Sequence, residues 1–129
     1  MSPYGLPQLL WVGFGGFLGS IGRFVLAGMA NRLSPTLAFP IGTLTVNILG
    51  CLAIGFVHGL AETRGLLGPD ARIFLFIGVL GGFTTYSTFG FESMALLRDG
   101  EVLKTSANIL LHIILGLVAV WAGDSLGRL

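Results

Sequence analysis

The sequence predicts an all-α membrane protein, a single transmembrane domain over residues 1–129 with four membrane-spanning helices. The first observation is composition: 53% of the 129 residues are hydrophobic and 10% are charged, whereas soluble domains carry about 25% charged residues. The second is that four apolar segments each reach the roughly 20 residues that one spanning helix needs. These segments are about 7–30, 41–61, 73–97 and 103–126. The third is that the chain left between them is too short for a soluble catalytic domain.

The first span combines small residues with one cation. Gly15, Gly19 and Arg23 recur every four residues, so they share one helix face. Small residues at this spacing let helix backbones approach closely. Arg23 points at a neighbouring helix or a cavity, because a charged side chain facing lipid is costly. This favours a role at a pore mouth or in a vestibule that attracts anions; the alternative is that the side chain snorkels towards the loop near Arg32.

The second span carries Thr43, Asn47 and Cys51 on one face, again four residues apart. The Asn47 side chain can donate two hydrogen bonds and accept at its carbonyl. It is therefore either a ligand in a permeation path or a hydrogen-bonding contact between helices. Cys51 is the single cysteine, which excludes an intrachain disulfide and a cysteine-based metal cluster. We expect Cys51 to be a small packing residue.

The third span contains the most informative segment, residues 81–89 (GGFTTYSTF), which should lie at membrane depth. Two glycines and two β-branched threonines within five residues form a poor helix, so we expect the third helix to be broken at its centre, over residues 81–85. Non-helical backbone at this depth is tolerated where it lines a cavity, and its freed carbonyls suit a hard cation. Tyr86, Phe89 and Glu92 follow at intervals of three, so an aromatic face leads to a carboxylate.

The fourth span places Thr105, Asn108, His112 and Gly116 along one stripe, with spacings of three and four. His112 lies deep in the span, where an ionisable residue is by default a functional candidate. The competing interpretation is a neutral tautomer whose hydrogen bonds are satisfied by a neighbouring helix. The stripe does not predict a metal site, because one histidine without an adjacent cysteine or carboxylate supplies too few ligands.

The basic residues are divided evenly between the two sides of the membrane. With four spans, the chain ends and the second loop share one side, and the first and third loops share the other. The positive-inside rule, which sets orientation by an excess of lysine and arginine on one side, therefore predicts no preferred orientation here. Either the protein inserts in both orientations and pairs with an inverted copy of itself, or another cue decides. Leaving out Arg23, the counted residues are Arg64, Arg72 and Arg128 on one side and Arg32, Arg98 and Lys104 on the other.

The segment 81–89 followed by Glu92 resembles the motif of the fluoride channel family known as Fluc or CrcB. Two further segments match that family's pattern. These are the first-span run from Gly15 to Phe24, which includes Arg23, and residues 40–47 (PIGTLTVN). The chain length and the number of spans match as well, so the resemblance covers essentially the whole chain.

The resemblance implies an antiparallel, dual-topology homodimer with two separate fluoride pores at its interface. The expected function is a fluoride-selective passive channel that exports cytoplasmic fluoride and confers fluoride resistance. The expected location is the cell inner (plasma) membrane, as a multi-pass protein. The expected partners are the fluoride ion, the lipid bilayer and a second copy of the chain. Nucleic acid is not expected, because the basic residues are scattered and form no stripe.

The resemblance also implies roles for individual residues. The backbone carbonyls of Gly81 and Thr84 from both subunits would hold one structural Na⁺ at the dimer interface. Two departures from the family pattern stand out: the first aromatic position is tyrosine rather than phenylalanine, and Gly116 stands where the fourth span often has a hydroxyl residue. The implied pore residues are the aromatic pair Tyr86 and Phe89, the pore-lining Asn47, the polar residues Thr85, Ser87 and Thr88, and the first-span Arg23.

Two functions from other classes remain open. A small dual-topology multidrug exporter that couples drug efflux to protons would carry a carboxylate deep in its first span. Here that span has Arg23 and no acid, and Glu92 lies late in the third span. In a non-conducting assembly subunit, the polar residues would only join helices. We expect no enzyme, because no nucleophile–base pair or metal set is recognisable.

Overall fold

The computed structural model describes residues 4–129, and within them four helical spans are long and apolar enough to cross a membrane. Two are the continuous helices α1 (Leu6–Leu33) and α2 (Ile41–Arg64), and the last is α6 (Val102–Gly127). The third span is interrupted. It consists of α3 (Pro69–Arg72), the π-helix η1 (Ile73–Leu80), α4 (Gly81–Phe83) and α5 (Tyr86–Arg98). The four predicted spans are confirmed, with helices that extend a few residues beyond the predicted limits.

The interruption of the third span lies at Thr84 and Thr85, within the stretch 81–85 where the sequence predicts it. Gly81–Phe83 is helical, so the predicted break is confirmed but covers only the last two of the five predicted residues. Thr84 and Thr85 are extended, with ψ angles of 158° and 113°. Gly82 serves close packing instead, because a Cβ there would lie 2.7 Å from the carbonyl oxygen of Gly16. Tertiary contact has overridden the low helix propensity of glycine.

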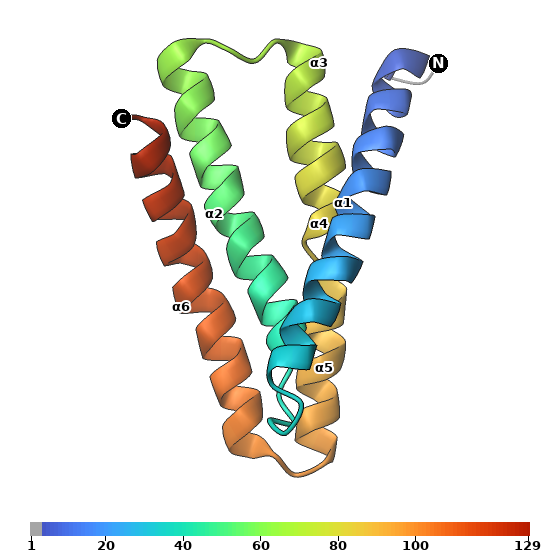
Figure 1. Cartoon of the computed structure of the whole chain (residues 1–129), viewed down its shortest axis with the longest axis vertical. Helices are drawn as coiled ribbons and strands as arrows, with labels where there is room; N and C mark the ends of the chain where they lie inside the picture. The colour runs from blue at the N-terminus through green and yellow to red at the C-terminus, as the bar shows by residue number, and fades with distance from the viewer. Residues whose placement is uncertain (1–3) are drawn as a thin grey trace.

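Glycines bring α2 and α6 together over much of their length, and Figure 1 shows the two helices side by side. A Cβ at Gly123 would collide with the carbonyl oxygen of Leu52, and one at Gly127 with that of Phe56. Gly55 meets the backbone of α6 in the same way. Small residues in membrane helices permit this close approach, which increases van der Waals contact between the backbones.

The second helix pair consists of α1 and the third span, which cross in Figure 1. A Cβ at Gly15 would lie 2.9 Å from the Cα of Gly78, and one at Gly19 would collide with the carbonyl oxygen of Val79. The predicted small-residue face of the first span is thereby confirmed as a packing face. The two pairs are joined by α1–α2 contacts, including a hydrogen bond from the Gly42 N–H to Asn31 Oδ1 at 2.9 Å.

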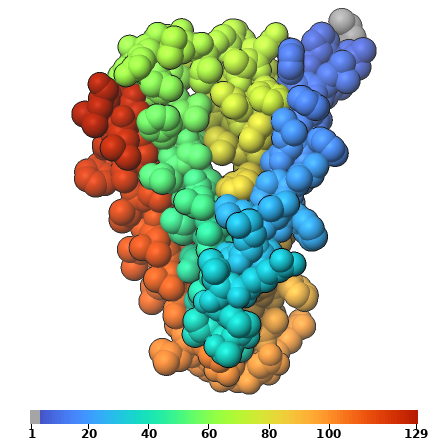
Figure 2. Space-filling view, viewed as in Figure 1, coloured from blue at the N-terminus to red at the C-terminus, as the bar shows by residue number. Residues whose placement is uncertain are grey.

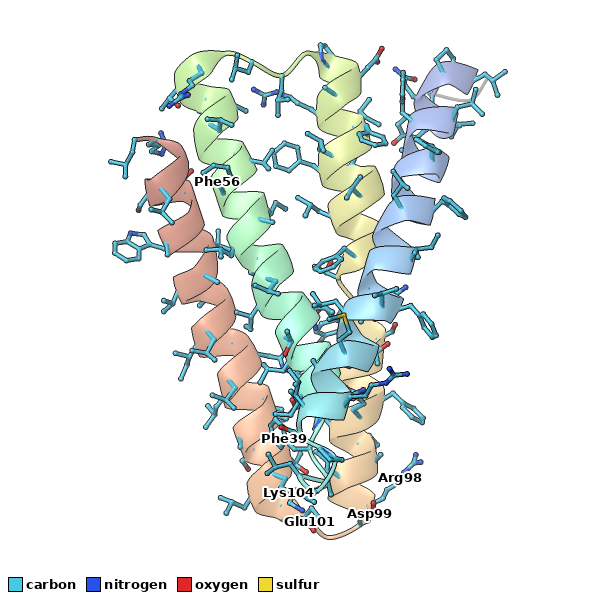
Figure 3. All side chains as sticks on the ribbon, in the orientation of Figure 1. Phe39, Phe56, Arg98, Asp99, Glu101 and Lys104 are labelled. Carbon is cyan, nitrogen blue, oxygen red and sulfur yellow. The ribbon has the colours of Figure 1, made fainter. Side chains whose placement is uncertain are left out.

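The start of α1, the end of α6 and the connection 65–68 lie at one end of the molecule (Figure 1). Figure 2 shows that this end is the broader one. The other two connections lie at the narrow end, where Figure 3 labels Phe39, Arg98, Asp99, Glu101 and Lys104. Lys104 Nζ lies 3.0 Å from Glu101 Oε1 there. This arrangement agrees with the assignment of loops to sides that the sequence predicts.

Large apolar side chains cover much of the outside of the described chain. Phe17, Leu117 and Trp121, for example, are 60%, 70% and 72% exposed. A helix that is apolar around most of its circumference requires an apolar surrounding, either protein or lipid. The four spans and this surface together describe a multi-pass membrane protein.

Candidate functional site

Asn47 on α2 bridges the break in the third span. Its Nδ2 donates to the carbonyl oxygen of Thr85 at 3.0 Å, and its Oδ1 accepts from the Thr85 N–H at 2.8 Å. One amide thus satisfies both backbone groups of a residue that lies outside any helix. Unpaired backbone groups are costly at membrane depth, so this contact makes the break tolerable. The structure shows the contact between helices; the ligand role of Asn47 stays a prediction.

Thr85 also begins α5 with its own side chain. Its Oγ1 accepts from the Thr88 N–H at 3.2 Å, which is the hydrogen bond of a helix N-cap. The same hydroxyl donates to Thr88 Oγ1 at 2.9 Å and lies 3.4 Å from Ser87 Oγ. The structure therefore brings the three predicted hydroxyl residues together at the first turn of α5.

These contacts release two carbonyl oxygens from helical hydrogen bonding. In an α-helix each N–H donates to the carbonyl four residues earlier. The Thr85 N–H donates to Asn47 instead, and the Thr88 N–H donates to Thr85 Oγ1. The carbonyls of Gly81 and Thr84 lose those donors. They are the two carbonyls predicted to hold a cation, and both residues line the first cavity described below.

The first cavity has a volume of about 770 Å³ and lies between α2, α6 and the third span. Tyr86 and Phe89 line it, with ring centroids 5.7 Å apart and planes inclined at 51°. Tyr86 is 85% exposed, so most of its ring has no neighbour within the described chain. The predicted residues Asn47, Thr84 and Thr85 line the same cavity.

The second cavity has a volume of about 510 Å³ and lies between α1, α2 and the first turn of α5. Arg23 lines it, together with Thr43, Thr85 and Thr88. Thr85 lines both cavities, so the break separates one from the other. Of the predicted pore residues, Ser87 is exposed and lines neither of these two cavities.

A further set of polar side chains, on α2, α5 and α6, forms hydrogen bonds that the sequence does not predict. Thr43 Oγ1 donates to Glu92 Oε1 at 2.8 Å, and Asn108 Nδ2 donates to Ser93 Oγ at 3.0 Å. Ser93 in turn donates to the carbonyl oxygen of Phe89 at 2.8 Å. The spacing of Phe89 and Ser93, four residues on one helix, is the signal that could have identified Ser93.

The hydrogen bonding of His112 differs from the second interpretation, a neutral tautomer satisfied by a neighbouring helix, and its functional role stays a prediction. Its Nδ1 lies 2.9 Å from the carbonyl oxygen of Asn108 in its own helix rather than from a neighbouring one. Its Nε2 is buried and has no hydrogen-bond partner among residues 4–129. The ring lies against Phe89, with centroids 4.3 Å apart. His112 also lines the first cavity.

Comparison with known proteins identifies similar chains of nearly the same length. Residues 10–124 match the family model described as "CrcB-like protein, Camphor Resistance (CrcB)". A protein of Methylobacillus flagellatus named "Fluoride-specific ion channel FluC" is 47% identical over 122 residues, 95% of each chain. Proteins of the same name from Nitratidesulfovibrio vulgaris (strain Miyazaki F) and Opitutus terrae are 44% and 46% identical. These matches cover 96% and 88% of this chain, and 99% and 87% of the relatives.

Proposed function

This chain belongs to the CrcB family, and from that premise we propose that it is a fluoride-specific ion channel. The main support is that the chain is similar over nearly its full length to proteins named as such channels, with 47% identity to one of them. It is a transport protein and not an enzyme, as the sequence predicts. The finer proposal is that fluoride flows passively out of the cytoplasm across the inner membrane, which confers resistance to environmental fluoride.

The chemistry of the site suits a small, strongly hydrated anion. Such an ion enters a pore only if protein donors replace its water. One amide hydrogen of Asn47 remains after the bond to Thr85, and the Thr88 hydroxyl, which accepts from Thr85 Oγ1, keeps its own hydrogen for donation. Aromatic rings are positive at the edge and negative at the face, so the edges of Tyr86 and Phe89 attract an anion.

Arg23 is proposed to attract fluoride to the pore mouth. It lines the second cavity, and no acidic side chain pairs with it in the part of the chain that the structure describes. A cationic group in a cavity with low-dielectric walls raises the local concentration of anions. This supports the vestibule interpretation of Arg23.

The antiparallel homodimer is proposed from the exposed polar site and the family resemblance. Tyr86 exposes 85% of its surface at membrane depth, although its hydroxyl needs a hydrogen-bond partner there. A second, inverted copy packed over the first cavity would supply protein contacts to Tyr86 and close two equivalent pores. The equal division of basic residues supports insertion in both orientations.

A single structural Na⁺ is proposed at the centre of that dimer, held by the Gly81 and Thr84 carbonyls of both subunits. Backbone oxygens are suitable ligands for a hard cation, and broken helices supply them in other membrane proteins. The loss of helical donors at both carbonyls supports this choice. The bound ion would add positive potential beside the two pores.

The proton-coupled exporter is not favoured. Its shared carboxylate would have to be accessible to protons and substrate, whereas Glu92 is held by Thr43 and its Oε2 is buried. The relatives named above are fluoride channels. Uptake of a cationic drug that requires protons and disappears in Glu92→Gln would reverse this choice.

Fluoride release from liposomes tests the proposed function directly. Purified protein is reconstituted, and fluoride and chloride efflux are recorded with ion-selective electrodes after a potassium ionophore is added. We expect rapid fluoride efflux and negligible chloride efflux. Absence of fluoride efflux from protein verified as folded and inserted would contradict the channel, and equal efflux of both anions would contradict its specificity.

A further inference from the structure

Three rings that line the first cavity contact one another in series: Tyr86 contacts Phe89, and Phe89 contacts His112 on α6. The pair Phe89–His112 has the shortest centroid separation of the four ring contacts in the described chain, 4.3 Å, with planes inclined at 41°. Aromatic pairs, offset-stacked or edge-to-face, prefer centroid separations of about 4.5–7 Å. His112 therefore overlaps a face of the Phe89 ring rather than touching only its rim.

The orientation of the imidazole is determined by one hydrogen bond. The carbonyl oxygen of Asn108, 2.9 Å from Nδ1, can only accept, so Nδ1 carries the hydrogen and donates it. In this neutral ring Nε2 is an acceptor, and it is buried without a partner among the described residues. An acceptor lone pair repels fluoride. Neither nitrogen of this tautomer is thus free to donate a hydrogen bond to the ion.

We propose that His112 is a positioning residue for Phe89, an inference that rests on the proposed fluoride channel. The imidazole, held by the Asn108 carbonyl, covers one face of the Phe89 ring. With that face covered, the ring keeps its positive edge towards the first cavity, which both residues line. Ser93, which donates to the Phe89 carbonyl and accepts from Asn108, holds the backbone of the same residue.

Three substitutions of His112 separate ring packing from hydrogen bonding in the liposome assay. His112→Phe keeps a flat ring and removes the nitrogens, His112→Asn keeps a donor for the Asn108 carbonyl and removes the ring, and His112→Ala removes both. We expect the Asn and Ala variants to lower fluoride efflux about fivefold to tenfold, the value of one well-placed aromatic contact. The Phe variant should keep efflux within about twofold of the wild type.

Coupling to Phe89 supplies a second readout. If His112 acts through Phe89, the double variant Phe89→Leu/His112→Ala should lose no more efflux than Phe89→Leu alone, whereas independent effects would multiply. Efflux that survives in His112→Asn but is lost in His112→Phe would overturn the proposal, and so would wild-type efflux in His112→Ala. A wild-type protein without efflux overturns the channel and this inference together; the other outcomes concern His112 alone.

Discussion

The amide of Asn47 shows how one residue can shape a site and belong to it. It pairs with both backbone groups of Thr85, and it directs the Thr85 N–H away from the Gly81 carbonyl. The residue expected to meet the ion therefore also holds the backbone that presents the other groups. Loss of Asn47 should affect stability and conduction together, which a simple pore ligand would not do.

Asn47→Ala tests this double role. Removing the amide leaves the N–H and carbonyl of Thr85 unpaired, which should lower the free energy of unfolding by about 2–4 kcal/mol. Fluoride efflux should fall in parallel. Thermal unfolding in detergent and liposome efflux are the two measurements. Ser125→Ala is the matched control, because it also removes a side chain-to-backbone bond (to the Trp121 carbonyl, 2.8 Å) but on an exposed helix surface. Unchanged stability in Asn47→Ala would contradict the role of the bridge.

Phe89→Leu tests the aromatic edge. Leucine fills a similar volume but has no quadrupole, so fluoride efflux should fall by at least about tenfold while the protein remains folded. Phe91→Leu is the control, because Phe91 lies on the same helix, is 71% exposed and lines neither described cavity. Equal efflux in both variants would remove Phe89 from the pore.

At the scale of the elements, glycines determine which helices pair. The α2–α6 and α1–third span contacts both leave no room for a Cβ at their closest points. The break in the third span depends on this pairing, because α2 carries Asn47 to Thr85 only if the helices keep their separation. Helix packing and the geometry of the site are therefore coupled.

Gly123→Ala should disrupt the α2–α6 pair. The new Cβ would collide with the carbonyl oxygen of Leu52, which a rigid backbone cannot avoid, so we expect a loss of about 1–3 kcal/mol in stability. Gly13→Ala is the control: a Cβ there meets nothing within 4 Å, and alanine favours the helix. Thermal unfolding of the two variants should shift in opposite directions, or at least by clearly different amounts. Similar shifts would show that the backbones can move apart freely.

At the scale of the whole molecule, the two ends present similar charge to the two sides of a membrane. Arg72 pairs with Glu62 at the broad end and Lys104 with Glu101 at the narrow end. The connections at both ends are short, so neither end offers a large charged domain that would dictate orientation. The similar charge of the two ends and the exposed first cavity support the proposed dimer of inverted copies.

Orientation can be forced with lysines. Thr36→Lys with Ala38→Lys adds two charges at exposed positions of loop 34–40, so this variant alone should insert in one orientation and form no antiparallel dimer. Co-expression with a variant that carries two lysines in loop 65–68 should restore both dimer and efflux. Thr36→Gln with Ala38→Gln is the neutral control. Active dimers formed by the two-lysine variant alone would show that dual topology is wrong.

Removal of sodium tests the shared ion. Purification and reconstitution with N-methylglucamine in place of Na⁺ should lower the thermal stability of the dimer and its efflux rate. Return of Na⁺ should restore both, because a ligand that binds only the folded state stabilises it. If neither thermal stability nor efflux rate depends on Na⁺, the proposed Na⁺ site at the Gly81 and Thr84 carbonyls is wrong.

The sequence by itself determined the four spans, the small-residue face of the first span and the membrane environment, because these follow from apolar length and helical periodicity. It also marked a break in the third span, over residues 81–85. Only the tertiary structure decided that Gly81–Phe83 stays helical and that the chain opens at Thr84 and Thr85. The physical reason is that the Asn47 amide on another helix satisfies Thr85, while close contact with α1 favours glycine in a regular helix.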